Sequence, residues 1–281
     1  GSFGMTASAS QDPIVAQIAA ADTRRRLSFR ITFVLTWIVL LGAFILWLLT
    51  LPENPVTGRK PFDPEFILET LPFLLAGVPM TVMVSIASII FAVVLAIIGA
   101  LGRLSGSAII YGVASLYVSV VRGTPLIVQI LFVFWALPQI IPELSRVPAP
   151  IMGTVALAFN YGAYMTEIFR AGIQAVPQGQ REAAMALGMS NRRIMGKIVM
   201  PQAIRIVTPA IGNEFIAMIK DSALVSWIGV QELLWRARIE GSANFRSLET
   251  YLTAAAIYWI LTMVLSLAQD RLEKRMARGD R

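Results

Sequence analysis

Long uncharged stretches dominate the chain, and short segments between them hold most of its charges. Residues 31–51 contain no Asp, Glu, Lys or Arg, and this length matches the roughly 20 residues that an α-helix needs to cross a bilayer. A cleaved signal peptide is the alternative, but its apolar region covers about 7–15 residues and ends at a small-residue cleavage site. Here the run continues into Pro52-Glu53-Asn54-Pro55. We therefore expect a retained membrane span at residues 31–51.

Five more spans are expected further along the chain. The uncharged run at residues 71–101 is longer than one bilayer thickness, so this helix should tilt or begin at the interface. Arg122-Gly123-Thr124-Pro125 interrupts the next apolar stretch, and Pro125 should break a helix there. We expect a helix on the membrane surface before Arg122. The other four spans are placed at residues 125–141, 150–169, 203–222 and 250–269, which gives six in total.

Lysine and arginine are unevenly distributed over the segments between these spans. Cytoplasmic segments of membrane proteins carry an excess of both residues. With a cytoplasmic N-terminus, 17 of the 24 Lys and Arg residues fall on the inner side, including the cluster Arg24-Arg25-Arg26. Both termini are therefore expected in the cytoplasm. Residues 1–4 are set aside as a cloning remnant, and the rest of residues 1–30 is expected to form a cytoplasmic arm.

Composition supports a membrane protein and limits the available chemistry. Hydrophobic residues make up 56% of the chain and charged residues 15%, against about 45–50% and 25% in soluble domains. The net charge of +7 could indicate a nucleic-acid partner, but the inner-side excess of basic residues explains it without one. The chain has no Cys and no His. Disulfides, thiol nucleophiles, Ser-His-Asp hydrolysis and Cys- or His-based metal sites are therefore excluded, and no metal site is expected.

The inner segment at residues 171–201 is the most informative polar part of the sequence. Pro177 is suited to start a short helix, and Gly188 suits the C′ position that ends one. Ser190 can cap a second short helix. The first helix would contain small residues that let another protein surface approach its backbone closely: Ala183, Ala184 and Ala186. This segment therefore predicts a contact site for a partner protein.

The same segment resembles the EAA motif of permease subunits in binding-protein-dependent ABC importers. That motif has Glu-Ala-Ala followed by Gly, then Ile, a variable position, Leu and Pro. Met200 replaces the Leu here, a swap of similar volume. The matching residues are Glu182, Ala183, Ala184, Gly188, Ile198 and Pro201. The resemblance implies a coupling helix that inserts into a groove of an ATP-hydrolysing subunit, with Gln180 and Ala186 on the same helix. Taken alone, Glu182 would be an ordinary exposed carboxylate near a helix start.

The resemblance extends over residues 67–275 to the polar amino-acid permeases, the histidine, glutamine, glutamate, arginine and opine group. It is carried by Arg122-Gly123-Thr124-Pro125-Leu126 with Gln129, by Glu167 with Arg170-Ala171-Gly172, and by Gly212-Asn213-Glu214 followed by Lys220-Asp221-Ser222. That family has five spans and an external N-terminus. It implies an all-α polytopic membrane protein with the type I ABC-importer permease fold. Residues 31–51 would then be an extra N-terminal span, which moves the N-terminus inside.

Two carboxylates lie in or beside the predicted spans and are candidates for the substrate pathway. A carboxylate inside the membrane is costly and by default faces a partner or a wet cavity. Glu214 has no basic residue within one turn of its helix, which favours the functional interpretation. Glu167 precedes Arg170 by three residues, so an ion pair at the interface is an equal alternative. Asn160 and Asn213 could line the same cavity.

Two interpretations, a gating role and a purely structural role, are open for several other polar residues. Arg122 is either part of the family's Arg-Gly-Thr-Pro segment or a simple cytoplasmic anchor. Lys220 and Asp221 are either part of the same family pattern or a surface pair that contributes little. Gly123, Thr124 and Pro125 are grouped with Arg122 as gating or structural residues.

The expected function is that of a transmembrane subunit of an importer of polar amino acids in the bacterial inner membrane. No glycine-rich phosphate-binding loop occurs in the sequence, so ATP and Mg²⁺ are expected in a partner ATPase and no cofactor in this chain. The expected partners are the ATPase subunits, a second permease subunit, an external amino-acid-binding protein, the substrate and membrane lipid. A non-catalytic membrane anchor, an importer of another small solute and a membrane enzyme are the alternatives. A membrane enzyme would need a paired-carboxylate motif or a Lys nucleophile within a span, and the sequence has neither.

Overall fold

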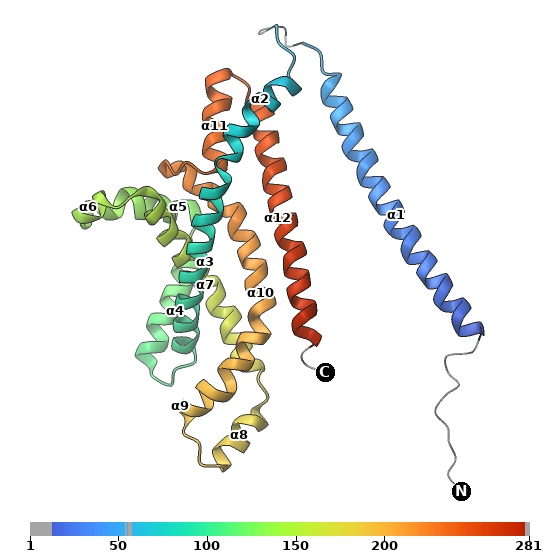
Figure 1. The fold of residues 1–281 in the computed structure, drawn as a ribbon. Helices are drawn as coiled ribbons and strands as arrows, with labels where there is room; N and C mark the ends of the chain where they lie inside the picture. The colour runs from blue at the N-terminus through green and yellow to red at the C-terminus, as the bar shows by residue number, and fades with distance from the viewer. Residues whose placement is uncertain (1–12, 54, 56–57, 279–281) are drawn as a thin grey trace. The chain divides into compact units, whose positions relative to one another are not determined.

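The computed structural model describes residues 13–53, 55 and 58–278, and these residues form helices without a single strand. The chain divides between residues 63 and 64 into two compact units. The first contains one long helix, α1 (Pro13–Leu49), which includes the predicted span at residues 31–51. The second unit, from Pro64 onward, contains all of the remaining helices (Figure 1).

Helix α7 (Ala149–Ala175) is the central helix of the second unit. It packs against α3 (Val78–Arg103), against α4 (Ala108–Arg122) and against α10 (Met200–Asp221). Small residues permit this close packing, as they do between membrane helices generally. A Cβ atom added at Gly99 of α3 would collide with Thr166 of α7, and one added at Gly172 of α7 would collide with Val207 of α10.

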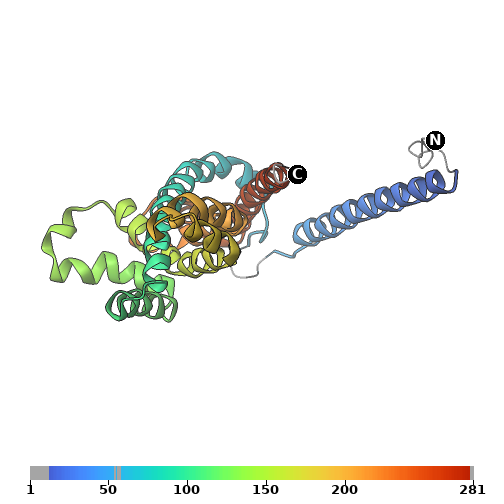
Figure 2. The ribbon, with the colours of Figure 1, turned by 90° about the horizontal axis from the view of Figure 1, so that it is seen from below.

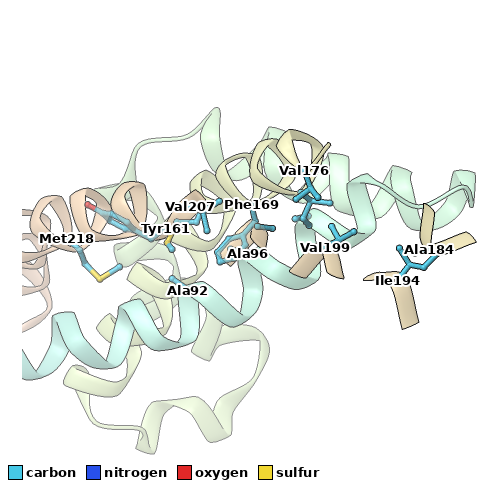
Figure 3. Close-up of a cluster of buried hydrophobic side chains, with 14 residues drawn as sticks. Ala92, Ala96, Tyr161, Phe169, Val176, Ala184, Ile194, Val199, Val207 and Met218 are labelled. Carbon is cyan, nitrogen blue, oxygen red and sulfur yellow. The ribbon is translucent and has the colours of Figure 1, made fainter. Parts of the chain in front are cut away.

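Buried side chains of these helices form one elongated hydrophobic cluster (Figure 3). It begins around Ala92 of α3 and Met218 of α10 and passes through Phe169 of α7. It ends at Ala184 and Ile194, which belong to the inner segment at residues 171–201. The predicted partner-contact segment is therefore attached to the main helical bundle by a continuous apolar core.

Four helical stretches of the described residues are long and apolar enough to cross a membrane, or five when a bent helix pair is counted as one span. They are Arg24–Leu49, Pro64–Arg103, Asn191–Ile228 and Ser247–Met276, with Ala108–Arg122 and Leu126–Ile140 as the bent pair. The predicted span at residues 150–169 lies in α7, which is absent from this set. Its 27 residues would reach about 40 Å, which is long enough to cross a membrane. Polar residues such as Asn160 lower the mean hydropathy of α7. They are tolerated there because they are surrounded by neighbouring helices rather than by lipid.

The helix predicted before Arg122 is present as α4 (Ala108–Arg122), but it does not lie apart from the bundle. Helix α4 instead packs along α3 and α7, and Tyr117 of α4 donates a hydrogen bond to the backbone oxygen of Phe159. After Arg122 the chain bends by 106° into α5 (Leu126–Leu131), a π-helical turn (Phe132–Ala136) and α6 (Leu137–Ile140). Figures 1 and 2 both show this segment extending sideways from the bundle of α3, α7 and α10.

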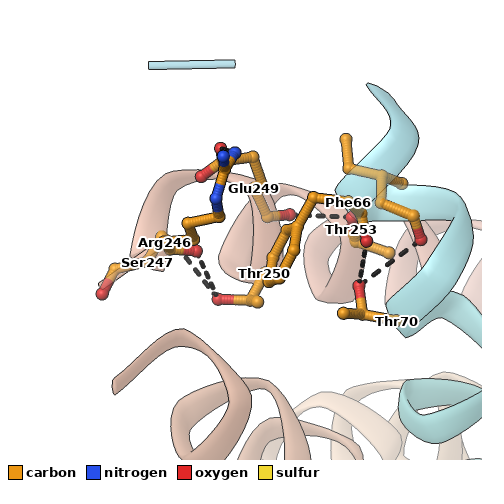
Figure 4. A network of polar contacts seen from close by, with 8 residues as sticks. Phe66, Thr70, Arg246, Ser247, Glu249, Thr250 and Thr253 are labelled. Carbon is orange, nitrogen blue, oxygen red and sulfur yellow. Dashed lines mark hydrogen bonds and ion pairs between the residues drawn. The ribbon is translucent and has the colours of Figure 1, made fainter. Parts of the chain in front are cut away.

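The remaining helices of the second unit pack together at the end of the bundle that lies opposite the inner segment. A 3₁₀ segment (Ser222–Ile228) leads to α11 (Leu233–Asn244), which forms a hairpin with α12 (Ser247–Arg278). Helix α2 (Pro64–Leu75) packs on both. Figure 4 shows the start of α12 beside α2, where Arg246 forms an ion pair with the buried Glu249 over 2.9 Å and lies over the ring of Phe66.

Candidate functional site

The predicted short helix of the inner segment is present as α8 (Gln178–Ala186). It begins directly after Pro177 and ends before Gly188, whose φ of 75° is in the left-handed region. The Met189 N–H donates to the Ala184 oxygen over 3.1 Å, and the Gly188 N–H donates to the Met185 oxygen over 2.9 Å. This is the Schellman arrangement that a C′ glycine permits. The sequence therefore predicted both ends of this helix correctly.

Helix α8 is held in place by the packing of one of its faces in the apolar cluster and by two side-chain hydrogen bonds. Ala184 is buried in the apolar cluster with Ile194 (Figure 3). Arg181 donates to the backbone oxygen of Ile173 at the end of α7, and Gln202 of α10 donates to the side chain of Gln180. Both helices that enter and leave the segment are thereby tied to α8, so a force applied to α8 would reach α7 and α10 directly.

The opposite face of α8 is exposed and mixed in character. Glu182 points outward and accepts a hydrogen bond from Gln178 over 2.8 Å. Ala183 and Ala186 are exposed as well. Leu187 is 83% exposed and Met185 is 51% exposed. Exposed apolar side chains that lie side by side are typical of a protein-contact surface.

The second half of the segment differs from the prediction of a separate short helix. Ser190 occupies the N-cap position of α9 (Asn191–Ile194), but its side chain makes no capping hydrogen bond. Helix α9 then continues through a π-helical segment (Met195–Val199) straight into α10. Pro201 follows directly after the π-helical segment, where its missing N–H removes one hydrogen bond from this continuous helix, and its side chain is exposed.

Asn160 lies at the bend between α4 and α5. It is 5% exposed, and its Nδ2 donates to Oε1 of Gln129 over 3.0 Å. The Gln129 Nε2 in turn donates to the backbone oxygens of Val121 and Thr124, over 2.7 and 3.1 Å, and to the Thr124 hydroxyl over 2.8 Å. The break at Gly123 and Pro125 leaves these carbonyls without helical partners. Asn160 therefore supports the bend, and its amide donor is already used within this chain.

Arg122, at the end of α4, lies over the ring of Tyr164 of α7 at 5.2 Å. This contact is a cation–π interaction within the bundle. Together with the Gln129 bonds it makes the Arg122–Pro125 segment a junction of three helices, α4, α5 and α7.

Glu167 of α7 lies between two arginines. Its Oε1 is 3.3 Å from Nε of Arg103 on α3, and its Oε2 is 2.8 Å from Nε of Arg170. Arg103 also donates to Ser115 of α4 over 2.6 Å. The alternative of an i,i+3 ion pair with Arg170 is therefore realised, and the pair is extended to a second helix. The negative charge of Glu167 is balanced within this chain.

Glu214 differs from Glu167 in its surroundings. It is half-buried on α10 and, among the described residues, forms no hydrogen bond or ion pair. Asp221 lies two turns further along the same face of α10, and its Oδ2 accepts a hydrogen bond from the Tyr161 hydroxyl of α7 over 2.8 Å. Lys220 and Asn213 are exposed. The partner of Asp221 is thus Tyr161 and not Lys220.

Glu232 is a buried carboxylate that sequence reasoning did not identify. It is 0% exposed at the N-cap of α11 and accepts from the N–H groups of Leu234 and Trp235, over 2.9 and 2.7 Å. The hydroxyls of Tyr258 on α12 and Thr81 on α3 also contact it. Burial raises the pKa of this carboxyl, whereas the hydrogen bonds lower it by less. A carboxylate placed just before an apolar helical pattern was the available signal in the sequence.

A metal centre is not part of the described site. Among residues 13–53, 55 and 58–278, no group of acidic side chains is arranged to hold a metal ion. The polar residues that the sequence singled out instead fall into four places: the exposed face of α8, the junction at Arg122–Pro125, the ion pairs of Glu167 between α3 and α7, and the α7–α10 contact that contains Glu214 and Asp221.

Comparison with known proteins gives the family. The model of the binding-protein-dependent transport system inner membrane component matches residues 92–278. The chain belongs to this family. The matched region includes α7, α8 and α10, so the inner segment at residues 171–201 and the Glu214 region of the permease lie within the part that defines the family. The resemblance inferred from Glu182, Gly188 and Pro201 is confirmed.

Curated relatives of the permease match over most of their own length. The L-cystine transport system permease protein TcyB of Bacillus subtilis (strain 168) is 40% identical over 208 residues, which cover 74% of this chain and 88% of TcyB. The glutamine transport system permease protein GlnP of Escherichia coli (strain K12) is 36% identical over 215 residues, which cover 76% and 98%. About a quarter of this permease therefore lies outside these alignments.

Solved structures confirm the fold class. A chain in the crystal structure of an amino acid ABC transporter with histidines is 40% identical, with a TM-score of 0.69 over 76% of this permease and 99% of that chain. A chain of the MetNI methionine ABC transporter has a TM-score of 0.62 at 20% identity and shows the fold alone. The permease is thus an all-helical membrane protein with an ABC-importer permease fold, as the sequence predicted.

Proposed function

We propose that this permease is the transmembrane subunit of an ATP-driven importer of polar amino acids. The observation that carries the proposal is the EAA register displayed on α8, with Glu182 and Leu187 exposed and Gly188 in the left-handed conformation that ends the helix. The names of the relatives, which include L-cystine, glutamine and arginine transport system permease proteins, support the amino-acid substrate class.

Energy would enter through a partner ATPase that binds ATP and Mg²⁺, because this chain has no glycine-rich phosphate-binding loop. The exposed face of α8 is the proposed docking surface. Its bonds to Ile173 and Gln202 connect that surface to α7 and α10. Rigid-body movement of α8 would therefore tilt the two helices that carry Glu214 and Tyr161, which is the motion that alternating access requires.

A second permease subunit and an external binding protein complete the proposed assembly. The second subunit is either a copy of this chain or a paralogue, since one helical bundle presents only one wall of a pore. The assembly is placed in the bacterial inner membrane with both termini of this chain in the cytoplasm, an orientation supported by the excess of Lys and Arg on the inner side.

Substrate contact is assigned to Glu214. An α-amino acid brings an ammonium group into the pore, and a half-buried carboxylate without a partner in this chain is suited to bind it. Asp221 lies on the same face but is engaged by Tyr161. Glu167 and Asn160, whose polar groups are engaged by Arg103, Arg170 and Gln129, are secondary candidates, as is the exposed Asn213.

The test is reconstitution of the permease with its ATPase in liposomes, together with its external binding protein. ATP hydrolysis is measured while each of the common amino acids is supplied in turn. We expect polar amino acids to stimulate hydrolysis and the permease alone to hydrolyse no ATP. Stimulation by a sugar or a metal ion but by no amino acid would contradict the substrate class. The permease role itself would fail if this chain did not co-purify with an ATPase.

A further inference from the structure

One face of α1 combines arginines with an exposed aromatic ladder. Arg25, Arg26 and Arg30 are exposed and surround Phe29, which is itself 72% exposed, in a shallow depression lined by these four side chains. With about 100° of rotation per residue, the four positions fall within an arc of roughly 140°. Helix α1 lies before residue 92, where the family match begins, so the family does not account for this face.

The aromatic ladder continues down the same face of the helix. Phe29 stacks on Phe33 with ring centroids 6.5 Å apart, and Phe33 contacts Trp37 at 5.9 Å. These residues recur every four positions and therefore follow one stripe of the helix. Phe33 is 53% exposed and Trp37 is 45% exposed. The stripe thus changes from cationic to aromatic at the point where the uncharged run at residues 31–51 begins.

We propose that this face of α1 binds an anionic phospholipid, with the phosphate between Arg25, Arg26 and Arg30 and the first part of an acyl chain along Phe29 and Phe33. Guanidinium groups form paired hydrogen bonds with phosphate oxygens, and their charge favours a lipid of net negative charge over a zwitterionic one. The aromatic stripe offers an apolar surface of the kind that acyl chains cover.

The general preference for basic residues on the cytoplasmic side is the simpler explanation of these arginines. It requires only positive charge near the span, at any angle around the helix. It does not require Phe29 between the arginines or the aromatic ladder continuing from them. The placement of both on one stripe points to a lipid lying along the helix.

The test uses the purified full-length permease in detergent, where no membrane sidedness exists and the orientation effect cannot contribute. Retention of phosphatidylglycerol is compared with retention of phosphatidylcholine of the same acyl chains by native mass spectrometry. We expect a preference for phosphatidylglycerol that falls about fivefold for each arginine removed, since each basic residue near an anionic surface contributes on that order. The main variant is R25Q/R26Q/R30Q.

A matched variant removes three basic residues from the end of α12: R271Q/K274Q/R275Q. It should change phosphatidylglycerol retention by less than twofold. Equal losses in the two variants, or no preference for phosphatidylglycerol in the unmodified chain, would overturn the proposal.

Two further arms separate a lipid site from a simple anion site. Phe33→Ala should weaken phosphatidylglycerol binding severalfold although it removes no charge. Inorganic phosphate at the concentration of the lipid should not displace the lipid, because it lacks the acyl chain. Displacement by phosphate together with an unchanged affinity in the Phe33→Ala variant would show that the arginines bind free anions, and the lipid proposal would be wrong.

Discussion

Asn160 of α7 and Gln129 of α5 are joined by a hydrogen bond of 3.0 Å. This bond holds the Gln129 side chain in the position from which it bonds across the bend between α4 and α5. Gln129 uses both of its amide hydrogens on oxygens that the break at Gly123 and Pro125 leaves exposed. The bend of 106° is therefore held by side chains rather than by the helices themselves. Two variants separate the contributions of these residues.

Gln129→Leu should destabilise the permease by about 1–3 kcal/mol, the cost of leaving buried polar groups without partners. Asn160→Leu should cost less, because Gln129 keeps its own bonds to Val121 and Thr124. The measurement is the unfolding midpoint of the detergent-solubilised chain. Gln139→Leu is the control, since Gln139 is exposed on α6 and bonds only within its own turn. Equal midpoints for Gln129→Leu and Gln139→Leu would show that the network does not support the bend.

Gly188→Val should uncouple transport from ATP hydrolysis while leaving the permease in the membrane. A β-branched residue in the left-handed region costs about 1–2 kcal/mol or more, and it would disrupt the bonds that end α8. Gly106→Val is the matched control, because Gly106 lies in the short α3–α4 connection with a negative φ and open space around it. Uptake is measured in cells at equal expression. Normal uptake in the Gly188→Val strain would mean that the shape of this segment does not matter for coupling.

Glu182→Lys addresses the docking surface itself. The side chain is exposed and bonds only to Gln178, so charge reversal should leave the fold intact and weaken contact with the ATPase. We expect co-purification of the ATPase to fall at least tenfold with an unchanged unfolding midpoint of the permease. Retention of the ATPase at normal yield would place the contact elsewhere.

Glu232→Ala should be among the most destabilising single changes in the second unit. It removes the cap of α11 and leaves two N–H groups and the hydroxyl of Tyr258 without their acceptor, which together should cost about 2–4 kcal/mol. The exposed Glu69 provides the control, Glu69→Ala. An unfolding midpoint as high as that of the control would show that the buried carboxylate is dispensable.

The same residue predicts a pH dependence. Its pKa is raised in the folded protein by burial, so the folded state binds the proton more tightly than the unfolded state. The stabilisation from this group is therefore present below the usual Glu pKa and is lost as the pH rises through the raised value. Glu232→Gln cannot titrate, so the midpoint of the unmodified permease should fall relative to that of the Gln variant as the pH increases. A constant difference would contradict the raised pKa.

The sequence predicted the start and end of α8 well because the signals for them are local. Pro177, the alanines of α8 and Gly188 determine the start, the packing and the end of one short helix within a few residues. The placement of α4 could not be predicted in this way, because its position depends on contacts with Phe159 and Tyr164 of α7, which lie far along the chain. Membrane spans were inferred from hydropathy, which responds to lipid contact and therefore assigns α7 less clearly than the outer helices.

The polar residues show the same division between local and distant information. Glu167 and Arg170 are three positions apart, and their ion pair was anticipated as an alternative, whereas the contribution of Arg103 was not. The bond between Tyr161 and Asp221 joins two helices and left no trace in the sequence pattern. Glu232 had a local signal, as a carboxylate just before an apolar helical pattern, but the contacts that α3 and α12 make with it join distant parts of the chain.

Glu214→Gln tests the proposed substrate contact. The amide preserves shape and hydrogen bonding but lacks the charge that would bind an ammonium group, so the amino-acid concentration that half-stimulates ATP hydrolysis should rise roughly tenfold to a hundredfold. Basal hydrolysis and assembly should stay unchanged. Glu143→Gln, at an exposed site after α6, is the control. An unaltered half-stimulating concentration would mean that recognition lies with the external binding protein, and poor assembly would indicate a structural role.

Topology is tested by single cysteines placed in a chain that has none of its own. Positions 10, 58 and 276 lie before α1, between α1 and α2, and near the end of α12. If residues 31–51 span the membrane and the arginine cluster stays in the cytoplasm, an impermeant thiol reagent should label only position 58 in intact spheroplasts. Permeabilised cells should show labelling at all three positions, which controls for reactivity. Labelling of only one of positions 10 and 276 in intact spheroplasts would indicate an odd number of spans, and labelling of both would place both ends outside. Either result would rule out six spans with both ends in the cytoplasm.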